Sequence, residues 1–387
     1  MGRLDCNHLF VDILKLLILR DSLVDALSMK GGTGDHSYAT NSHYQRSVFY
    51  EIQPLVIENV REMLLKNRFP GCIKVADLGC STGQNTVLAM SAIAYTIMES
   101  YQQMSKNPPE IDCYLNDLPE NDFNTTFKMF HSFQEKLKPE VKGKCFVSGV
   151  PGSFYSRLFP RKSLHFVHSA FSIHWLSRIP DGLESNTKSI HIKYPYPSNI
   201  YESYLNQFKN DFSSFLKMRS EEIVHNGHMV LTFVGRKVSK TLSKDCFQVW
   251  SLLSDCLLDL ASEGFVNDSM VESFNIPFYN PNEEEVKEVI LKEGSFEITK
   301  IEKFDHVVPY KIDREEEDEE QSLQLEAGIK HASWARCITE PLLVAHFGDA
   351  IIEQVFDKYA HYMAKYLSVS NHRPNMTLVI VVSLTRK

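Results

Sequence analysis

The sequence predicts an α/β fold, a mainly parallel sheet of seven strands with helices on both of its faces. Short apolar runs that are typical of buried strands recur along the chain. Helix-like stretches lie between most of these runs, and this alternation is typical of a parallel sheet. The final apolar run ends the printed chain, so we expect the sheet to contain inserted segments.

The expected strands fall into an early and a late group. Five come first, at 73–78 (IKVADL), 111–116 (IDCYLN), 144–149 (KCFVSG), 163–169 (SLHFVHS) and 228–234 (HMVLTFV). Two come late, at 296–303 (FEITKIEK) and 377–384 (TLVIVVSL). Since the chain returns to the sheet for the late pair, much of the intervening chain is expected to lie outside the sheet.

The expected helices begin with 86–104, directly after a glycine turn. The helical stretches near 201–224, 244–263 and 338–367 are expected to include a cap over the carboxyl-terminal edge of the sheet, where ligands bind in open α/β folds. The expected organisation is an N-terminal extension (1–28) and a single domain (29–387), whose cap comes from segments at about 201–224, 244–295 and 313–370.

Composition excludes several classes of function. The chain has 387 residues, a net charge of −8 and no basic cluster, which argues against nucleic acid as a partner. Its eight cysteines form no CxxC pair, so neither a zinc site nor a disulfide framework is indicated. Free thiols fit a reducing cytosol, and a cytoplasmic location is therefore expected. The acidic run 313–320 is interpreted as a solvated loop.

The N-terminal stretch 9–27 (LFVDILKLLILRDSLVDAL) is apolar but interrupted by charge. Asp12, Lys15 and Arg20 leave it too short and too charged to span a membrane. Because no small-residue cleavage site follows, a secretory signal is not indicated either. We interpret the stretch as an amphipathic helix and expect no membrane partner.

The segment 75–86 (VADLGCSTGQNT) carries the first candidate chemistry. Residues 79–83 fit G-x-S-x-G, which would make Ser81 a serine-esterase nucleophile. The same residues resemble a glycine turn that places a cofactor on the N-terminus of the following helix. An esterase needs a later His and acid that do not stand out here, and a dinucleotide site needs G-x-G-x-x-G, which is absent.

A third interpretation is a methyl-donor site. Asp77 ends the first expected strand, and Gly79 and Gly83 would let the backbone approach a cofactor. Asp117 ends the second strand, and a carboxylate there can accept both hydroxyls of a ribose. A cationic sulfonium would also be stabilised near carboxylates.

Longer blocks of sequence carry a family resemblance. They are 28–46 (SMKGGTGDHSYATNSHYQR), 75–86, 114–124 (YLNDLPENDFN), 149–160 (GVPGSFYSRLFP), 168–177 (HSAFSIHWLS), 273–281 (SFNIPFYNP) and 338–348 (ITEPLLVAHFG). With these blocks the chain resembles the SABATH family of plant S-adenosylmethionine-dependent methyltransferases, which includes carboxyl methyltransferases for salicylate, benzoate, jasmonate and indole-3-acetate, and N-methyltransferases of the caffeine pathway. The resemblance implies a class I, Rossmann-like methyltransferase fold with a helical cap, and a homodimer.

Carried over residue by residue, the resemblance implies a set of donor-binding positions. Cys80 would be a wall residue in contact with the cofactor rather than a nucleophile, and Ser81 would cap the helix that follows. The full set is Lys30, Ser37, Tyr38, Asp77, Cys80, Asn85, Asp117, Leu118, Ser153 and Phe154.

The resemblance also implies that Gln45 and Trp175 hold the acceptor carboxylate as the catalytic pair. Their amide and indole N–H groups are neutral donors, which would leave the carboxylate nucleophilic. No general base is needed, because a carboxylic acid is already ionised at pH 7. Without the resemblance, Trp175 would be interpreted as a core residue and Gln45 as a helix-surface residue.

His174 is expected to line the acceptor site and affect selectivity without acting as a base. The other wall positions implied are Phe171, Val234, Val249, Trp250, Ala335 and, more weakly, Thr377. Some members of the family hold Mg²⁺, and the matching positions here are Asn186, Glu272, Phe274 and Asn275. One carboxylate with neutral oxygens would make a weak Mg²⁺ site.

The expected function is transfer of a methyl group from S-adenosylmethionine to the carboxylate of a small plant acid, benzoate or salicylate first. The alternatives are the same chemistry on indole-3-acetate, jasmonate or an iridoid acid, and N-methylation of a purine-like heterocycle. A serine esterase at Ser81 and a binding protein without turnover are the alternatives from other classes.

Overall fold

The computed structural model describes residues 26–136, 143–192, 198–237, 248–307, 320–369 and 376–387. The expected extension 1–28 lies outside the described residues except for its last three, of which Ala26 and Leu27 pack against the core. The acidic run 313–320 likewise lies outside them except for its final residue. Within the described ranges, no helix combines the length and apolar character needed to cross a bilayer.

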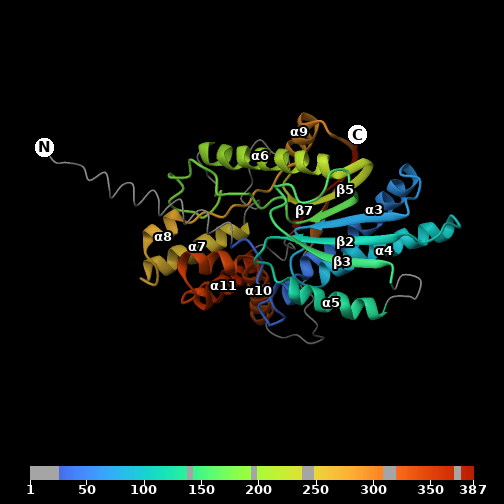
Figure 1. Cartoon of the computed structure of the whole chain (residues 1–387). Helices are drawn as coiled ribbons and strands as arrows, with labels where there is room; N and C mark the ends of the chain where they lie inside the picture. Colours follow the sequence, from blue (N-terminus) through green and yellow to red (C-terminus); the bar gives the residue numbers. More distant parts are fainter. Residues whose placement is uncertain (1–25, 137–142, 193–197, 238–247, 308–319, 370–375) are drawn as a thin grey trace.

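A seven-stranded sheet forms the centre of the protein, in the order β3-β2-β1-β4-β5-β7-β6 (Figure 1). Strands β1 to β5 are parallel, and β7 runs antiparallel between β5 and β6. The predicted fold class is confirmed. The strands are β1 (Cys72–Leu78), β2 (Glu110–Asp117), β3 (Cys145–Pro151), β4 (Leu164–Ala170), β5 (Ile223–Gly235), β6 (Phe296–Val307) and β7 (Met376–Arg386).

Alternate residues of the central strands supply two separate cores. In β5, Val230 belongs to one apolar cluster and Leu231 to the other, and in β7 Val381 and Val382 divide in the same way. Such division follows from the two-residue period of a strand. Because both faces are covered, these strands have near-continuous apolar sequences, as buried strands do.

One core packs beneath α3 (His43–Lys66), α4 (Gln84–Gln103) and α5 (Phe123–Lys136). The other packs beneath α6 (Ser198–Glu222) and α9 (Glu283–Glu293). The expectation that 201–224 belongs to a cap over the strand ends is therefore wrong for most of α6, whose Phe212 packs on Phe233 of β5 with ring centroids 5.6 Å apart. Since β4 and β5 are parallel neighbours, the segment between them supplies the crossover helix on the sheet face.

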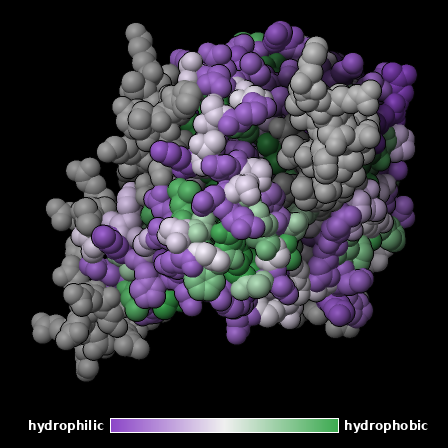
Figure 2. Space-filling view, turned by 90° about the vertical axis from the view of Figure 1, so that its left-hand side faces the viewer, coloured by the Kyte–Doolittle hydropathy of each residue, from purple (hydrophilic) through white to green (hydrophobic). Residues whose placement is uncertain are grey.

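The remaining helices gather at one end of the molecule, beyond the sheet (Figure 1). They are α7 (Gln248–Ser262), α8 (Asp268–Ser273), α10 (Glu320–Phe347) and α11 (Ile352–Val369). The short helix α2 (Tyr38–Asn41) lies against α10. Figure 2 shows the face of the molecule at this end, where hydrophobic residues gather in the middle among hydrophilic ones.

Candidate active site

The turn after β1 requires glycine at two positions. Gly79 has φ +73°, and a Cβ there would lie 2.1 Å from the Ser172 Oγ, well inside van der Waals contact. Gly83 has φ +115°, and a Cβ there would lie 2.9 Å from Ala39 of α2. Both φ values lie in the region that glycine adopts readily. The two glycines therefore let the turn pack against the segment after β4 and against α2.

Two carboxylates end neighbouring strands beside this turn. Asp77 is buried, and its Oδ1 lies 2.8 Å from Nδ1 of His168, its register partner on β4. The two oxygens of Asp117 accept the backbone N–H groups of Ser81 and Leu118, at 2.7 and 2.8 Å. Burial raises the pKa of Asp117 to about 6, and these two hydrogen bonds partly oppose that rise.

Ser81 does not cap the following helix, so that prediction is wrong. The N-cap of α4 is Gly83, and the Ser81 Oγ is buried without a hydrogen-bond partner among the described residues. Ser81 has φ +50°, and its backbone N–H donates to the Asp117 Oδ2. Within the described chain, no histidine contacts this hydroxyl to activate it as an esterase nucleophile would require.

Three further predicted donor-site residues lie close to the carboxylates. Burial first of all, and also the Asp117 and Asp77 charges, raise the pKa of Tyr38, whose hydroxyl is hydrogen-bonded to Asn85. Burial also raises the pKa of Cys80 well above its usual range, with both carboxylates adding to the rise. Cys80 therefore remains a thiol, as expected of a wall residue rather than a nucleophile.

Two predicted donor-site side chains are committed elsewhere. The Lys30 Nζ lies 2.5 Å from the Glu340 Oε1 on α10, and its side chain is 44% exposed. The Ser37 hydroxyl caps α2, since it accepts from the Thr40 N–H at 3.3 Å and donates to the Gly34 carbonyl at 2.7 Å. Both side chains therefore already have polar partners within the protein.

Residues 153–159, between β3 and β4, carry the last predicted donor positions. Phe154 packs against Tyr155 and Phe215, with ring centroids 4.8 and 5.9 Å apart. The Ser153 hydroxyl accepts the N–H of Tyr155 at 3.3 Å. The sheet register places Pro151, at the end of β3, beside Asp117, so this loop leaves the sheet next to the carboxylates.

The segment after β4 carries the predicted acceptor residues. Phe171 has φ +57°, uncommon for a residue with a bulky side chain. Trp175 is 9% exposed, and a backbone bridge pairs it with Phe278. An aromatic series joins these residues across the site through neighbouring ring pairs whose centroids lie 4.5 to 6.4 Å apart; its members are Trp334, Tyr44, Phe171, His174, Trp175, Phe278 and Trp250.

His174 is held as a neutral ring. Its Nδ1 accepts the backbone N–H of Val234 at 3.2 Å, and its side chain is buried. Burial lowers its pKa to about 3, against a smaller opposing effect of a hydrogen bond to the Phe171 backbone. A neutral, buried ring that is hydrogen-bonded to the backbone at Val234 and Phe171 is poorly suited to act as a base.

Gln45 and Trp334 both present buried polar atoms without partners among the described residues. These atoms are the Gln45 Oε1 on α3 and the Trp334 Nε1 on α10. The ring of Tyr44, which directly precedes Gln45 in the sequence, has its centroid 6.1 Å from that of the Trp334 ring. Leaving a polar atom buried and unpaired costs about 1–3 kcal/mol, so such atoms point to a missing ligand or water.

Sequence reasoning missed Tyr44, Phe278 and Trp334, although Tyr44 and Trp334 directly precede predicted positions. Their aromatic character was the only available signal. Among the predicted wall residues, Ala335 is completely buried, and Val234 and Val249 are half-buried. Burial raises the pKa of Tyr44, and nearby Thr377 partly opposes that rise.

The predicted Mg²⁺ positions do not fit a metal ion well. The Asn186 amide donates to the Asn275 Oδ1 at 2.8 Å, so these two side chains satisfy each other. Glu272 is exposed, whereas Phe274 is buried. No cluster of three or more His, Cys, Asp or Glu residues suited to a metal occurs in the described ranges.

A groove lies between α7 and α11, and its lining contains none of the predicted site residues. The strand ends and the aromatic series therefore remain the candidate active site. The groove is lined by Leu252, Asp255, Leu258, Asp259, Tyr362, Lys365 and Tyr366.

Comparisons with known proteins agree with this arrangement. A family model described as SAM dependent carboxyl methyltransferase matches residues 24–387. A salicylate/benzoate carboxyl methyltransferase of Arabidopsis thaliana is 49% identical over 367 residues, which cover 95% of this chain and 94% of that protein. A salicylate carboxymethyltransferase of Clarkia breweri is 39% identical over 362 residues, covering 93% and 98%.

A solved structure described as loganic acid methyltransferase with SAH superposes with a TM-score of 0.79 at 32% identity. The match covers 93% of this chain and 98% of that one. The likeness therefore extends over the sheet and over the helices at its end.

Proposed function

We propose, since the chain belongs to the family of SAM-dependent carboxyl methyltransferases, that its acceptor is a small aromatic acid of the benzoate or salicylate type. The observation that carries the proposal is the aromatic series from Trp334 to Trp250, which passes through Phe171 and Trp175. Flat aromatic walls suit a flat aromatic acid, because stacked and edge-on ring contacts add to the apolar area buried. The relatives named for salicylate and benzoate support the same class of acceptor.

The donor would lie over the turn after β1. S-adenosylmethionine, when bound, supplies a methyl group on a sulfonium cation. The buried Asp77 and the Asp117 carboxylate are suited to a cationic ligand with ribose hydroxyls, and each Asp117 oxygen keeps a lone pair beyond its backbone bond. Gly79 lets this turn pack directly against Ser172 of the segment after β4. The remaining proposed contacts are Tyr38, Cys80, Asn85, Leu118, Ser153 and Phe154.

The acid would be held by Gln45 and Trp175. Both offer neutral N–H donors, so they orient a carboxylate without neutralising it. His174 is already neutral and bonded to the backbone, which fits a reaction that needs no general base. Two ions become two neutral products, so a dry aromatic site favours the reaction, and alignment can contribute about 7–11 kcal/mol.

Three further expectations concern Mg²⁺, the oligomeric state and the cellular location. No step is assigned to Mg²⁺, because the residues at the expected positions fit it poorly. A homodimer remains a proposal based on the family resemblance, and sedimentation equilibrium would test it. A cytoplasmic location remains a proposal, based on a cysteine pattern that indicates no disulfide framework.

The test is an acceptor panel with methyl-labelled S-adenosylmethionine: benzoate, salicylate, anthranilate, indole-3-acetate, jasmonate, loganate and a xanthine. We expect a base-labile labelled ester, formed fastest from benzoate or salicylate. Trp175→Phe removes one N–H and keeps a ring, so it should raise KM for the acid at least tenfold with an unchanged Kd for S-adenosylhomocysteine. Label on the xanthine alone would overturn the proposal, and preference for jasmonate or loganate would overturn the aromatic acceptor.

A further inference from the structure

The loop 153–159 contacts both halves of the candidate site. Phe154, a proposed donor contact, is followed by Tyr155, whose hydroxyl lies 2.6 Å from the Trp175 carbonyl oxygen and 3.1 Å from that of Ile173. These two carbonyls flank His174 in residues 171–177, the segment after β4 that carries the predicted acceptor residues and is called the acceptor segment below. The Tyr155 side chain thus joins the loop that carries the donor contacts to the backbone that carries Trp175.

Tyr155 is suited to be a permanent donor in this contact. Burial raises its pKa well above the usual range, and the nearby Asp211 charge adds to the rise. The hydroxyl therefore keeps its proton, which it shares between the two carbonyls or gives mainly to the nearer one. On the other side of the segment, the His174 carbonyl accepts from the Tyr279 N–H at 2.9 Å. The acceptor backbone is consequently held from both sides.

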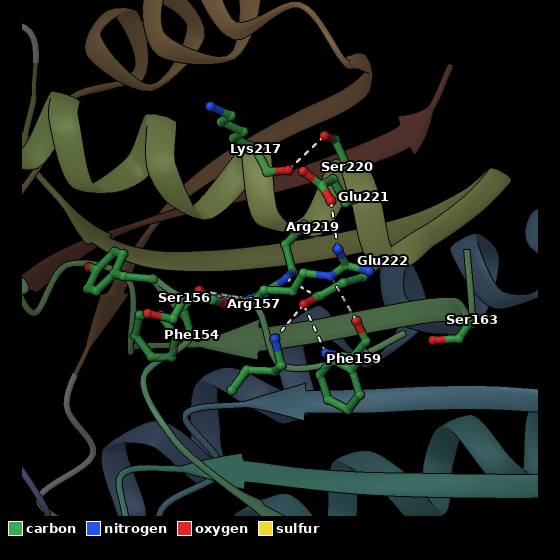
Figure 3. A network of polar contacts seen from close by, with 12 residues as sticks. Phe154, Ser156, Arg157, Phe159, Ser163, Lys217, Arg219, Ser220, Glu221 and Glu222 are labelled. Atoms are coloured by element: carbon green, nitrogen blue, oxygen red, sulfur yellow. Dashed lines mark hydrogen bonds and ion pairs between the residues drawn. The ribbon is translucent and has the colours of Figure 1, made fainter. Parts of the chain in front are cut away.

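A buried ion pair at the end of α6 fixes the same loop (Figure 3). Arg219 and Glu222 are both completely buried, with Nε and Oε2 2.7 Å apart. Arg219 also donates to the carbonyls of Phe154 and Ser156, at 2.8 and 3.0 Å. The Glu222 Oε1 accepts the N–H groups of Leu158 and Phe159, at 2.6 and 3.0 Å.

This buried ion pair is not expected to add much to the free energy of unfolding. Removing two charges from water costs several kcal/mol per ion, and apolar replacements of buried pairs are often neutral or stabilising. An apolar pair, however, could not bond four backbone groups within six residues of one loop. The function that explains the pair best is therefore orientation of the loop.

We propose that the loop 153–159 is a rigid spacer that sets the distance between the donor and the acceptor carboxylate. Tyr155 is its positioning residue toward the acceptor segment, and the Arg219–Glu222 pair is its anchor on α6. None of the three side chains needs to touch either substrate. Misplacement of reacting groups by about 1 Å can cost on the order of 100-fold in rate, so a spacer of this kind would act on kcat. The inference rests on the proposed methyl transfer.

The kinetic test compares two matched variants. Tyr155→Phe removes only the hydroxyl, and Tyr101→Phe removes a buried hydroxyl that bonds the Pro70 carbonyl, outside the candidate active site. We expect similar small losses of thermal stability in both. Only Tyr155→Phe should lower kcat, by about 10- to 100-fold, with the Kd for S-adenosylhomocysteine changed less than threefold. A kcat equal to that of Tyr101→Phe, or a loss confined to the cofactor Kd, would overturn the spacer.

A second measurement needs no turnover. Hydrogen exchange of the full chain, with and without S-adenosylhomocysteine, follows amides of the loop 153–159 and of the segment 171–177. In the wild type we expect S-adenosylhomocysteine to slow amide exchange in both the loop and the acceptor segment. In Tyr155→Phe we expect it to slow exchange in the loop alone. Equal protection of the acceptor segment in both proteins would refute the spacer. If coupling is seen but no acid is methylated, the proposed function fails and the spacer stands.

Discussion

The substitution Gly79→Ala tests whether the close approach at the turn after β1 shapes the donor site. A Cβ at this position would lie 2.1 Å from Oγ and 2.3 Å from Cβ of Ser172, so Ser172 must move. A side chain at a left-handed φ costs about 1–2 kcal/mol. Movement of Ser172 also breaks the hydrogen bond of its single hydroxyl proton, which is shared between the carbonyls of Gly79 and Ala170 at 3.1 and 3.0 Å.

This shared hydrogen bond contributes about 1 kcal/mol, so we expect a total loss of about 2–3 kcal/mol in the free energy of unfolding. Urea unfolding followed by tryptophan fluorescence measures it, and calorimetric titration with S-adenosylhomocysteine should show at least a tenfold weaker Kd. Gly71→Ala is the matched control, because nothing lies within 4 Å of its Cβ and the residue directly precedes the same strand.

A double mutant identifies the cause. Ser172→Gly alone removes the same shared hydrogen bond and should cost about 1 kcal/mol. Combined with Gly79→Ala it should cost little more than Gly79→Ala alone, because both changes remove the same contact and their effects do not add. Strictly additive costs, or a Gly79→Ala protein as stable as Gly71→Ala, would refute the reasoning.

Three further predictions concern single side chains. Burial raises the pKa of Asp117 to about 6, and its ionised form is the proposed acceptor of the ribose hydroxyls. The Kd for S-adenosylhomocysteine should therefore be constant above pH 6 and rise by up to tenfold for each pH unit below 6. The Asp117→Asn variant should show no such dependence on pH. Lys30→Met removes a partly exposed pair worth at most about 1 kcal/mol, so calorimetry should show the same Kd within threefold, and a tenfold loss would place the lysine on the donor. Trp334→Phe removes some packing, which destabilises the protein, and also removes an unpaired buried N–H that costs about 1–3 kcal/mol. Because these two effects oppose each other, the free energy of unfolding in urea should change by less than ~1 kcal/mol. The KM of Trp334→Phe for benzoate should rise threefold or more if this N–H serves the acid, and an unchanged KM would exclude that role.

The central strands could be predicted from the sequence because they are buried on both faces and therefore have continuous apolar sequences, whereas the edge strands β3 and β6 are more exposed. All seven expected runs lie within observed strands, apart from one or two terminal residues. The place of α6 was harder to predict. Its amphipathic face looks alike whether it packs on a sheet or on other helices, and only the parallel pairing of β4 with β5 decides between them.

The candidate site likewise contains some residues that could be predicted from the sequence and others that could not. Asp77, Gly79 and Asp117 could be located from sequence, since strand ends and glycine turns have local signals. The ion pair of Lys30 with Glu340 joins residues 310 apart in the chain, and no local pattern announces it. The same holds for Tyr155, whose carbonyl partners lie 18 and 20 residues away, and for Trp334, which depends on how α10 packs against α3.

The position of β7 between β5 and β6 bears on how the chain is made. Both neighbours leave the ribosome before β7, so each has an unpaired edge until the 376–386 segment is synthesised. Unpaired edges are templates for aggregation. At about 5–20 residues per second, the delay between β6 and β7 is on the order of several seconds. Nascent chains are therefore expected to need chaperone cover during that interval, and a premature stop before β7 should yield insoluble protein.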